Sequence, residues 1–224
     1  MAISLEQESR RVEEFKKTSW KQIFTVLFFS CSPALILLYS IGKYFLADVS
    51  FATGIHDLRA FSQTQDPHYL ITSYKAFSNA YDLNSHEPAI SSDFSTVAAY
   101  LSVISQDATI SGQLTHQAIA LSDKSIAGNP WHPNYFKTRS RVFLILASSD
   151  PKYYALADEA LAKAALISPT DPRIPLNRAK IYLYQKQLEL AQKYFAQALS
   201  LKPDLAPQVK FELDQYASTS ATKN

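Results

Sequence analysis

The sequence predicts an all-α chain, in which one N-terminal transmembrane helix is followed by an α-solenoid of about four helical hairpins and a capping helix. Two observations lead to this expectation: an uncharged apolar segment from Gln22 to Gly42, and a helical pattern that recurs along the rest of the chain. The composition agrees, because glycine accounts for only 4 of 224 residues, where about 7% is usual. A chain with so few glycines is poorly suited to the tight turns of an all-β fold or to glycine-rich phosphate loops.

Charge and cysteine content exclude several functional classes. The 22 Lys and Arg residues nearly balance the 20 Asp and Glu residues, so the net charge is only +2 and gives no bulk attraction for nucleic acid. Hydrophobic residues make up 47% of the chain, which excludes a wholly disordered protein. The single cysteine excludes a disulfide framework and a cysteine-based zinc site.

Residues 22–46 are predicted to form the transmembrane helix. The apolar run has about the ~20 residues that a helix needs to cross a hydrocarbon core of ~30 Å. Trp20 stands at one edge of the run and Tyr39 and Tyr44 at the other, and amphipathic aromatic residues favour the two membrane interfaces. Pro33, inside the run, would break a soluble helix but is tolerated in a transmembrane one.

Three alternatives to a permanent anchor stay open. A cleaved signal peptide has an apolar core of only about 7–15 residues, although residues 50–52 (Ser-Phe-Ala) could serve as a cleavage site. A lipoprotein would use Cys31, but Phe28 and Phe29 stand where its motif has smaller residues. The third alternative is the buried helix of a soluble domain.

The distribution of basic residues predicts the orientation of the anchor. Lys43 stands at the far boundary of the apolar run and Arg59 follows it, whereas five basic residues precede the run: Arg10, Arg11, Lys16, Lys17 and Lys21. Because cytoplasmic flanks are enriched in Lys and Arg, we expect a single-pass protein of the cytoplasmic (inner) membrane, with its N-terminus in the cytoplasm and the chain from Ala47 onward outside. Residues 1–21 are predicted to be a cytoplasmic charged juxtamembrane helix, either simply solvated or a docking site for a cytoplasmic partner.

A helix–turn–helix pattern recurs after the apolar run and is clearest in residues 172–205. Small residues recur where two helices would approach closely, and large residues recur where neighbouring units would meet. The small set is Ala179, Ala191 and Ala198, and the large set is Tyr182 and Phe195. Pro203 ends the second helix, because proline lacks an N–H group and disfavours helix at the residue before it.

The pattern predicts where each hairpin lies. The hairpins are placed at about 47–85, 88–128, 133–169 and 172–203, followed by a capping helix at 205–217 and a disordered tail at 218–224. No proline or glycine-rich linker separates the apolar run from the first hairpin. One nearly continuous helix is therefore expected to leave the bilayer and enter the solenoid of residues 47–217.

Residues 172–205 resemble the tetratricopeptide (TPR) repeat of about 34 residues, and residues 133–171 resemble it less closely. The order of motifs over roughly 35–205, including the stretch NPWHPNYFKTR at 129–139, is also similar to the extracytoplasmic C-terminal tail of bacterial O-antigen ligase/polymerase-type membrane proteins. Those enzymes carry their catalytic residues in a multi-span core that has no counterpart in this sequence. The resemblance therefore implies an accessory tail, and the glycan-transfer activity of those enzymes is not carried over to this chain.

Candidate binding residues lie on the first helices of the last two units, at positions that the TPR resemblance places on a concave groove. Basic and amide side chains at helical spacing could bind a carboxylate or a phosphate. The candidates are Asn134, Lys137, Arg141, Arg173, Asn177, Lys180 and Tyr184. Two interpretations stay open: a solvated face, or a groove for a peptide or an anionic glycan.

Other polar residues are interpreted as structural. Arg139 and Arg178 occupy equivalent positions in the two units. Each is expected either to lay its aliphatic stem on the neighbouring helix with its charged group exposed, or to pair with an acid such as Glu159 or Glu189. The histidines are scattered and form no H-E-x-x-H motif. No catalytic, cofactor or metal site is predicted.

These observations favour a non-enzymatic, membrane-anchored TPR scaffold or adaptor that mediates protein–protein interaction outside the cytoplasm, in a cell-envelope (surface polysaccharide) assembly. Its expected partner is a protein, with a multi-span glycan polymerase or ligase as the leading class, and nucleic acid is not expected. The alternative is a detached or truncated C-terminal part of an O-antigen ligase/polymerase-like enzyme that needs a multi-span catalytic core. An enzyme with an unrecognised site is a third hypothesis.

Overall fold

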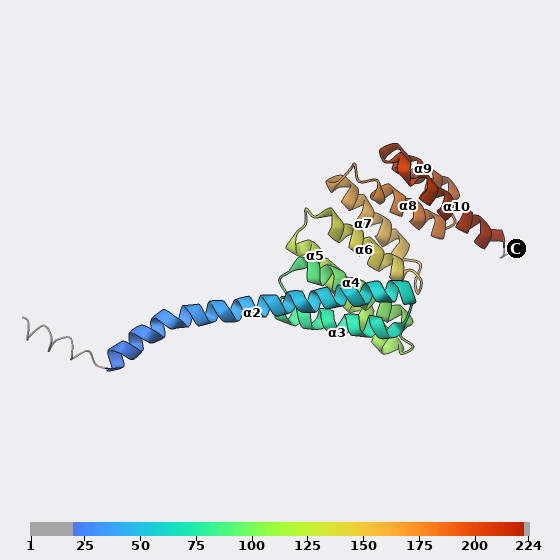
Figure 1. Ribbon diagram of the computed structural model, residues 1–224. Coiled ribbons are helices and arrows are strands. Elements are labelled where there is room, and N and C mark those ends of the chain that lie inside the picture. Colours follow the sequence, from blue (N-terminus) through green and yellow to red (C-terminus); the bar gives the residue numbers. More distant parts are fainter. Residues whose placement is uncertain (1–19, 222–224) are drawn as a thin grey trace, which may run out of the picture. The chain divides into compact units, whose positions relative to one another are not determined.

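The computed structural model describes residues 20–221 of the chain, and within this range the protein has nine α-helices, one short 3-10 helix and no strand (Figure 1). The predicted all-α fold class is therefore confirmed for the described residues. The helices are α2 Trp20–Thr64, α3 Pro67–Leu83, α4 Pro88–Ile104, α5 Ala108–Gly128, α6 Pro133–Leu146, α7 Tyr153–Ile167, α8 Arg173–Tyr184, α9 Leu188–Leu201 and α10 Ala206–Ala221. The predicted juxtamembrane helix lies almost wholly outside the described residues, as do residues 222–224 of the predicted tail.

The chain divides into two compact units, Met1–Leu46 and Ala47–Asn224. In the first unit, the described chain is the N-terminal part of α2, which contains Pro33 without interruption. The large apolar side chains described in this part of α2 are exposed, and they point in all directions around the helix: Ile23, Val26, Phe28, Phe29, Leu35, Ile36, Leu37, Leu38, Tyr39, Ile41, Tyr44, Phe45 and Leu46. Among the described residues one helical segment, Phe28–Thr64, is long and apolar enough to cross a membrane.

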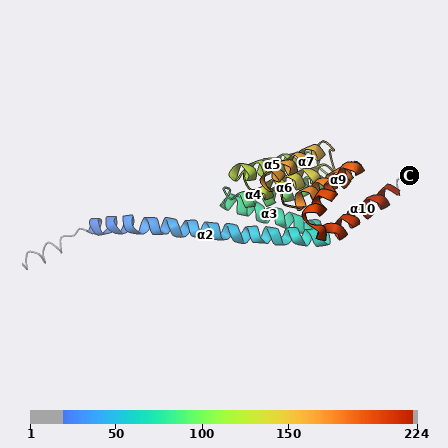
Figure 2. The same ribbon diagram turned by 90° about the horizontal axis from the view of Figure 1, so that it is seen from above.

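The second unit is a stack of antiparallel helical hairpins. The C-terminal part of α2 pairs with α3, and the pairs α4/α5, α6/α7 and α8/α9 follow (Figures 1 and 2). The helix α4 also packs against α6, and α10 packs against α8. Because each turn within a pair is short, α4, α6 and α8 run in the same direction. The end of the stack at which their first residues lie is the end at which the chain enters the unit, at Ala47.

Side-chain caps fix where several helices begin. An Asp66 carboxylate oxygen accepts a hydrogen bond from the backbone N–H of His68 at 2.9 Å, ahead of α3. Glu87 accepts from the backbone N–H of Ala89 at 3.3 Å, ahead of α4. Such caps satisfy N–H groups that the first turn of a helix leaves without an intrahelical partner. The Asp-Pro sequence at residues 66–67 therefore marks the start of α3.

Close helix packing depends on small residues at the crossing points. The hydroxyl of Ser73 on α3 donates to the carbonyl oxygen of Gly54 on α2 at 2.8 Å. A Cβ atom at Gly54 would stand only 2.9 Å from the ring of Phe77. Ala157 and Ala164 of α7 are likewise fully buried. Small side chains at these sites let the helix backbones approach, so that the large core residues fill the space between hairpins.

The helix α10 extends beyond the predicted capping helix. It runs from Ala206 to Ala221, whereas the sequence prediction ends the helix at residue 217 and places a disordered tail at 218–224. No glycine or proline follows Leu213 to interrupt the helix. The hydroxyl of Ser218 donates to the carbonyl oxygen of Gln215 at 2.8 Å, a back-bond that a serine can form inside a helix.

Candidate binding groove

A hollow of about 320 Å³ lies between α6 and α8. It is lined by Asn134, Lys137, Thr138, Ser140, Arg141, Leu144, Arg173 and Asn177. Five of the seven sequence-predicted candidates are in this set: Asn134, Lys137, Arg141, Arg173 and Asn177. The parallel α6 and α8 present these side chains to the same space, because the candidates recur at three- and four-residue intervals along each helix.

Lys137 is held in an ion pair across the two helices. Its ammonium nitrogen lies 2.8 Å from a carboxylate oxygen of Asp171, which immediately precedes α8, and both side chains are mostly buried. Burial alone would raise the pKa of Asp171, but hydrogen bonds from Lys137 and from the backbone N–H of Arg173 outweigh it, and the pKa lies below its ordinary value. Lys137 therefore shapes the hollow and carries little free positive charge into it.

Arg141 and Arg173 supply the available positive charge of the hollow. Both side chains are exposed, and neither guanidinium forms an ion pair within 4.0 Å among the described residues. A guanidinium presents five N–H donors in a planar fork that matches a carboxylate. With the amides of Asn134 and Asn177 nearby, the hollow can bind an acidic group.

The other two candidates lie away from this hollow. The ammonium group of Lys180 pairs with Glu212 on α10. Tyr184 stacks on Tyr154 of α7, with 6.5 Å between ring centroids. Lys180 therefore joins α8 to the capping helix, and Tyr184 is the exposed last residue of α8. The structure does not bring either side chain to the groove residues of α6.

A second hollow, of about 550 Å³, lies between α2, α4 and α6, and the sequence analysis missed it. Its lining residues are Ile55, Leu58, Arg59, Phe61, Ser62, Gln65, Asp93, Thr96, Tyr100 and Arg141. Arg141 lines both hollows, so the two hollows adjoin at this residue. We call them together the groove, because both lie along the first helices of successive hairpins. The sequence could have indicated this hollow. When Pro88 and Pro133, the first residues of α4 and α6, are aligned, Thr96 falls at the position of the groove candidate Arg141.

The charge in the second hollow is mixed. Asp93 is largely buried, and burial raises its pKa above the ordinary value despite the opposing effect of Arg141. Burial, followed by the negative charges of Glu87 and Asp93, also raises the pKa of Tyr135. Arg59 forms no ion pair among the described residues. The complete groove therefore presents three arginines without a carboxylate partner, Arg59, Arg141 and Arg173, against one buried aspartate.

Two buried hydroxyl groups in the groove have no hydrogen-bond partner. Thr96 Oγ1 lines the second hollow and Ser140 Oγ lines the first, and each residue is only 2% exposed. Buried polar groups are usually hydrogen-bonded, so these two hydroxyl groups are exceptions. The arrangement suits binding and has no nucleophile paired with a general base. Among the described residues there is no cluster of three His, Cys, Asp or Glu side chains that could hold a metal ion.

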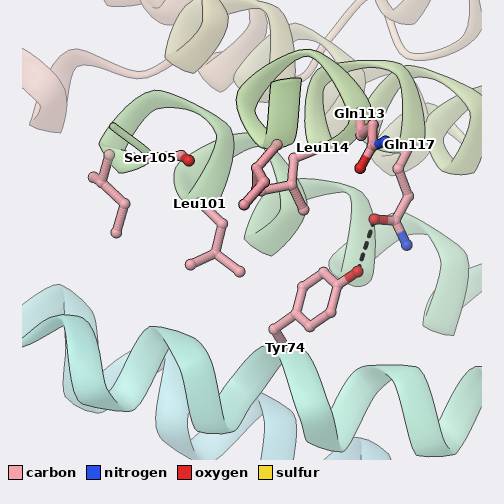
Figure 3. Close-up of a pocket in the computed structure, with 8 residues that line it drawn as sticks. Tyr74, Leu101, Ser105, Gln113, Leu114 and Gln117 are labelled. Carbon is pink, nitrogen blue, oxygen red and sulfur yellow. Dashed lines mark hydrogen bonds between the residues drawn. The ribbon is translucent and has the colours of Figure 1, made fainter. Parts of the chain in front are cut away.

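A third hollow, of about 510 Å³, lies between α3 and the α4/α5 hairpin (Figure 3). Its lining is uncharged and includes Tyr74, Leu101 and Leu114. The hydroxyl of Tyr74 donates to the side-chain oxygen of Gln117 at 2.8 Å, which ties α3 to α5 across the hollow. This site lacks the charged side chains that would orient a polar ligand.

The two arginines interpreted as structural do form ion pairs, but with other acids than expected. Arg139 pairs with Asp123 on α5, and Arg178 pairs with Asp158 on α7. The expected partners Glu159 and Glu189 are not the acids that they contact. Glu159 pairs with Lys163 on its own helix instead, at 2.8 Å.

No protein-family model and no curated protein sequence matches the chain. Among solved structures, the chain is similar to a thermophilic TPR protein of Thermus thermophilus, with 20% identity over 80% of this chain and 94% of that chain and a TM-score of 0.52. It is also similar to MamA, with 16% identity over 72% of this chain and 81% of that chain and a TM-score of 0.47. At these identities the similarity concerns the fold alone, and the chain has a TPR-like fold.

Proposed function

We propose that this chain is a non-catalytic, membrane-anchored scaffold whose TPR-like unit binds a protein partner through the groove formed by α2, α4, α6 and α8. The observation that carries this proposal is the convergence of Arg141, Arg173 and Asn177 on one hollow, which continues through Arg141 into a second. TPR-like neighbours support protein–protein interaction in general. The excess of arginine over available carboxylate favours an acidic segment of the partner.

The exposed apolar side chains of residues 22–46 support the anchor. A helix that is apolar around its whole circumference is either buried in protein or inserted in a membrane, and these side chains are exposed. The five basic residues ahead of the run favour a cytoplasmic N-terminus, with the TPR-like unit outside. Protease added to intact cells with a permeabilised outer barrier should then remove the TPR-like unit. Full protection would contradict this orientation.

A partner in the cell envelope follows from that location. The resemblance of residues 129–139 to tails of O-antigen ligase/polymerase-type proteins supports a multi-span glycan polymerase or ligase as the partner. The chain would then act as a separate scaffold of a surface-polysaccharide assembly.

The test is co-purification of the full chain from native membranes in mild detergent, with the bound proteins identified. The groove variant Arg141→Glu/Arg173→Glu reverses the charge of the hollow. The matched control, Lys193→Glu/Lys210→Glu, makes the same charge change at exposed positions on α9 and α10. We expect a stoichiometric membrane partner with wild type and control, and its loss with the groove variant. Retention of the partner by the groove variant would show that it binds elsewhere.

A further inference from the structure

The second hollow of the groove has an apolar wall. The wall comes from α2, where Ile55, Leu58 and Phe61 recur at three-residue intervals and so lie on one side of the helix. The Phe61 ring is 8% exposed and packs edge-on against the ring of Tyr100 on α4, with 5.5 Å between the ring centroids. Ile55 and Leu58 pack against the same core cluster and remain partly accessible. All of the lining residues belong to the second unit of the chain, Ala47–Asn224.

Opposite this wall, two polar side chains of α4 line the hollow. Asp93 forms no ion pair within 4.0 Å among the described residues, although Arg59 and Arg141 line the same hollow. Thr96 follows about one turn later, is 2% exposed, and has a hydroxyl group without a hydrogen-bond partner. A buried hydroxyl without a partner destabilises a fold, so packing alone would favour valine, which has the same shape. The hydroxyl is therefore available to a group that enters the hollow.

These side chains together define an occupant that is apolar in its middle and acidic at its edges. An apolar side chain that packs against Leu58 leaves water for an apolar surface, which favours binding. A carboxylate is disfavoured beside Asp93, because two like charges repel each other. The exposed side chains of Arg59 and Arg141 can instead bind carboxylates at the rim. A volume of about 550 Å³ is in the range of about 300–1,000 Å³ that is typical of ligand sites.

We propose that the second hollow selects the sequence of the partner segment, by taking a bulky apolar side chain that is flanked by acidic residues. The Thr96 hydroxyl donates to a main-chain carbonyl oxygen of that segment. The inference rests on the proposed function, because it concerns the same groove and the same protein partner. It adds selectivity to a charge attraction that by itself accepts any acidic segment.

Three model peptides test the proposal. They are acetylated amides of the sequence Gly-Glu-Glu-X-Glu-Glu-Gly with the same fluorescent label, where X is leucine, serine or glutamate. The full chain is reconstituted in lipid nanodiscs, because free detergent would compete for an apolar hollow, and fluorescence anisotropy at low ionic strength gives each Kd. We expect the leucine peptide to bind about tenfold more tightly than the serine peptide. The glutamate peptide should bind no more tightly than the serine peptide, despite its additional charge.

The apolar wall is tested by removing one leucine. Leu58→Ser should abolish the preference for the leucine peptide over the serine peptide. The matched control is Leu101→Ser, which removes another partly buried leucine, one that lines the third hollow and not the groove. The control should retain the preference. Loss of the preference in both variants would show that it does not arise from the second hollow.

The Thr96 hydroxyl is tested by a variant that keeps the shape of the side chain. Thr96→Val removes an unpaired buried hydroxyl, so it should raise the melting temperature and yet weaken binding of the leucine peptide about fivefold. The matched control is Ser122→Ala on α5, because the Ser122 hydroxyl is also buried without a partner and lines neither hollow of the groove. This control should raise the melting temperature and leave binding unchanged. Unchanged binding by Thr96→Val would overturn the contact with the main chain.

The outcomes separate selectivity from the proposed function. If no peptide binds, or if Arg141→Glu/Arg173→Glu binds the peptides as tightly as wild type, the attraction of the groove for acidic segments is overturned. If the leucine and serine peptides bind equally to wild type and are both lost in the charge-reversed variant, the groove function stands and the selectivity of the second hollow is overturned.

Discussion

Arg178 shows how one side chain can join two hairpins. Its guanidinium donates to both carboxylate oxygens of Asp158, at 2.6 and 2.7 Å, and it lies over the ring of Tyr194 at 4.4 Å. The hydroxyl of Tyr182 donates to the same carboxylate at 3.0 Å. These contacts connect α7, α8 and α9 through a largely buried, charge-assisted network.

Removing the carboxylate of this network should destabilise the fold. Asp158→Ala leaves the mostly buried Arg178 without its acceptor, and we expect a loss of about 2 kcal/mol in the free energy of unfolding. Urea unfolding of the detergent-solubilised chain, followed by circular dichroism, measures the loss. Lys163→Ala removes an exposed pair within α7 and should leave the midpoint unchanged. Equal stability of Asp158→Ala and wild type would show that the network contributes nothing net.

Asp93, which lines the groove, and Asp171, which pairs with the groove residue Lys137, should respond oppositely to loss of charge. The raised pKa of Asp93 means that its ionised form is unfavourable in the folded state, so Asp93→Asn should raise the melting temperature at pH 7. The lowered pKa of Asp171 means that ionisation stabilises the fold, so Asp171→Asn should lower it.

The pH dependence of folding stability should show the same opposite contributions of Asp93 and Asp171. As pH falls from neutral towards the ordinary aspartate pKa of 3.8, wild type gains stability through Asp93, and the advantage of Asp93→Asn should shrink. The contribution of Asp171 is present above pH 3.8 and is lost as pH falls through its lowered pKa. Thermal melts between pH 7 and acid conditions measure both trends, and parallel curves for the two variants would refute these assignments.

At the scale of the elements, the α2/α3 contact depends on the absence of a side chain at Gly54. The Phe77 ring opposite Gly54 is fully buried and in ring contact with Phe51 and Phe94, so it cannot move aside freely. The sequence marks Gly54 only as an isolated glycine in an apolar helix. Its role comes from tertiary packing, which no local pattern reveals.

Gly54→Ala should therefore destabilise the protein, although alanine favours helix. Overpacking against Phe77 costs about 1–3 kcal/mol, whereas helix propensity returns about 1 kcal/mol. Gly112→Ala is the matched control in α5, where a Cβ atom meets nothing within 4 Å, and it should stabilise the protein by up to about 1 kcal/mol. Chemical unfolding of both variants tests the difference, which would vanish if α2 could shift away from α3.

At the scale of the whole molecule, the TPR-like unit is a linear stack in which each hairpin contacts mainly its neighbours. The capping helix α10 covers the last hairpin with Val209, which packs on the cluster around Leu176, Ala191 and Phe195. Loss of packing at Val209 should therefore destabilise only the C-terminal end of the stack.

Val209→Ala should loosen the C-terminal hairpin by about 1–2 kcal/mol. Hydrogen exchange followed by mass spectrometry should show faster exchange in α8–α10 and unchanged exchange in α3–α5. Gln208→Ala, an exposed neighbour on α10, should leave both regions unchanged. Faster exchange throughout the stack after Val209→Ala would mean that the unit unfolds as one cooperative body.

The sequence predicts the fold class because the TPR-like register of residues 172–205 repeats small and large residues at fixed spacing. It also identifies five of the residues that line the first hollow, since groove positions follow from that register. It misses Asp93 and Thr96, because the earlier hairpins depart from the pattern. It also overestimates the free charge of Lys137, because the ion pair with Asp171 forms only once α8 has packed against α6. Helix packing likewise determines which acids lie opposite Arg139 and Arg178.

The sharing of Arg141 by both hollows affects which ligands the groove can distinguish. A single guanidinium that turns towards a group in one hollow withdraws its donors from the other. Two small anions, one in each hollow, would compete for it and bind with negative cooperativity. One elongated ligand that spans both hollows engages Arg141 once and gains the contacts of Arg59 and Arg173 at its two ends. We therefore expect the groove to bind one ligand that spans both hollows more tightly than two short ligands that each occupy one hollow.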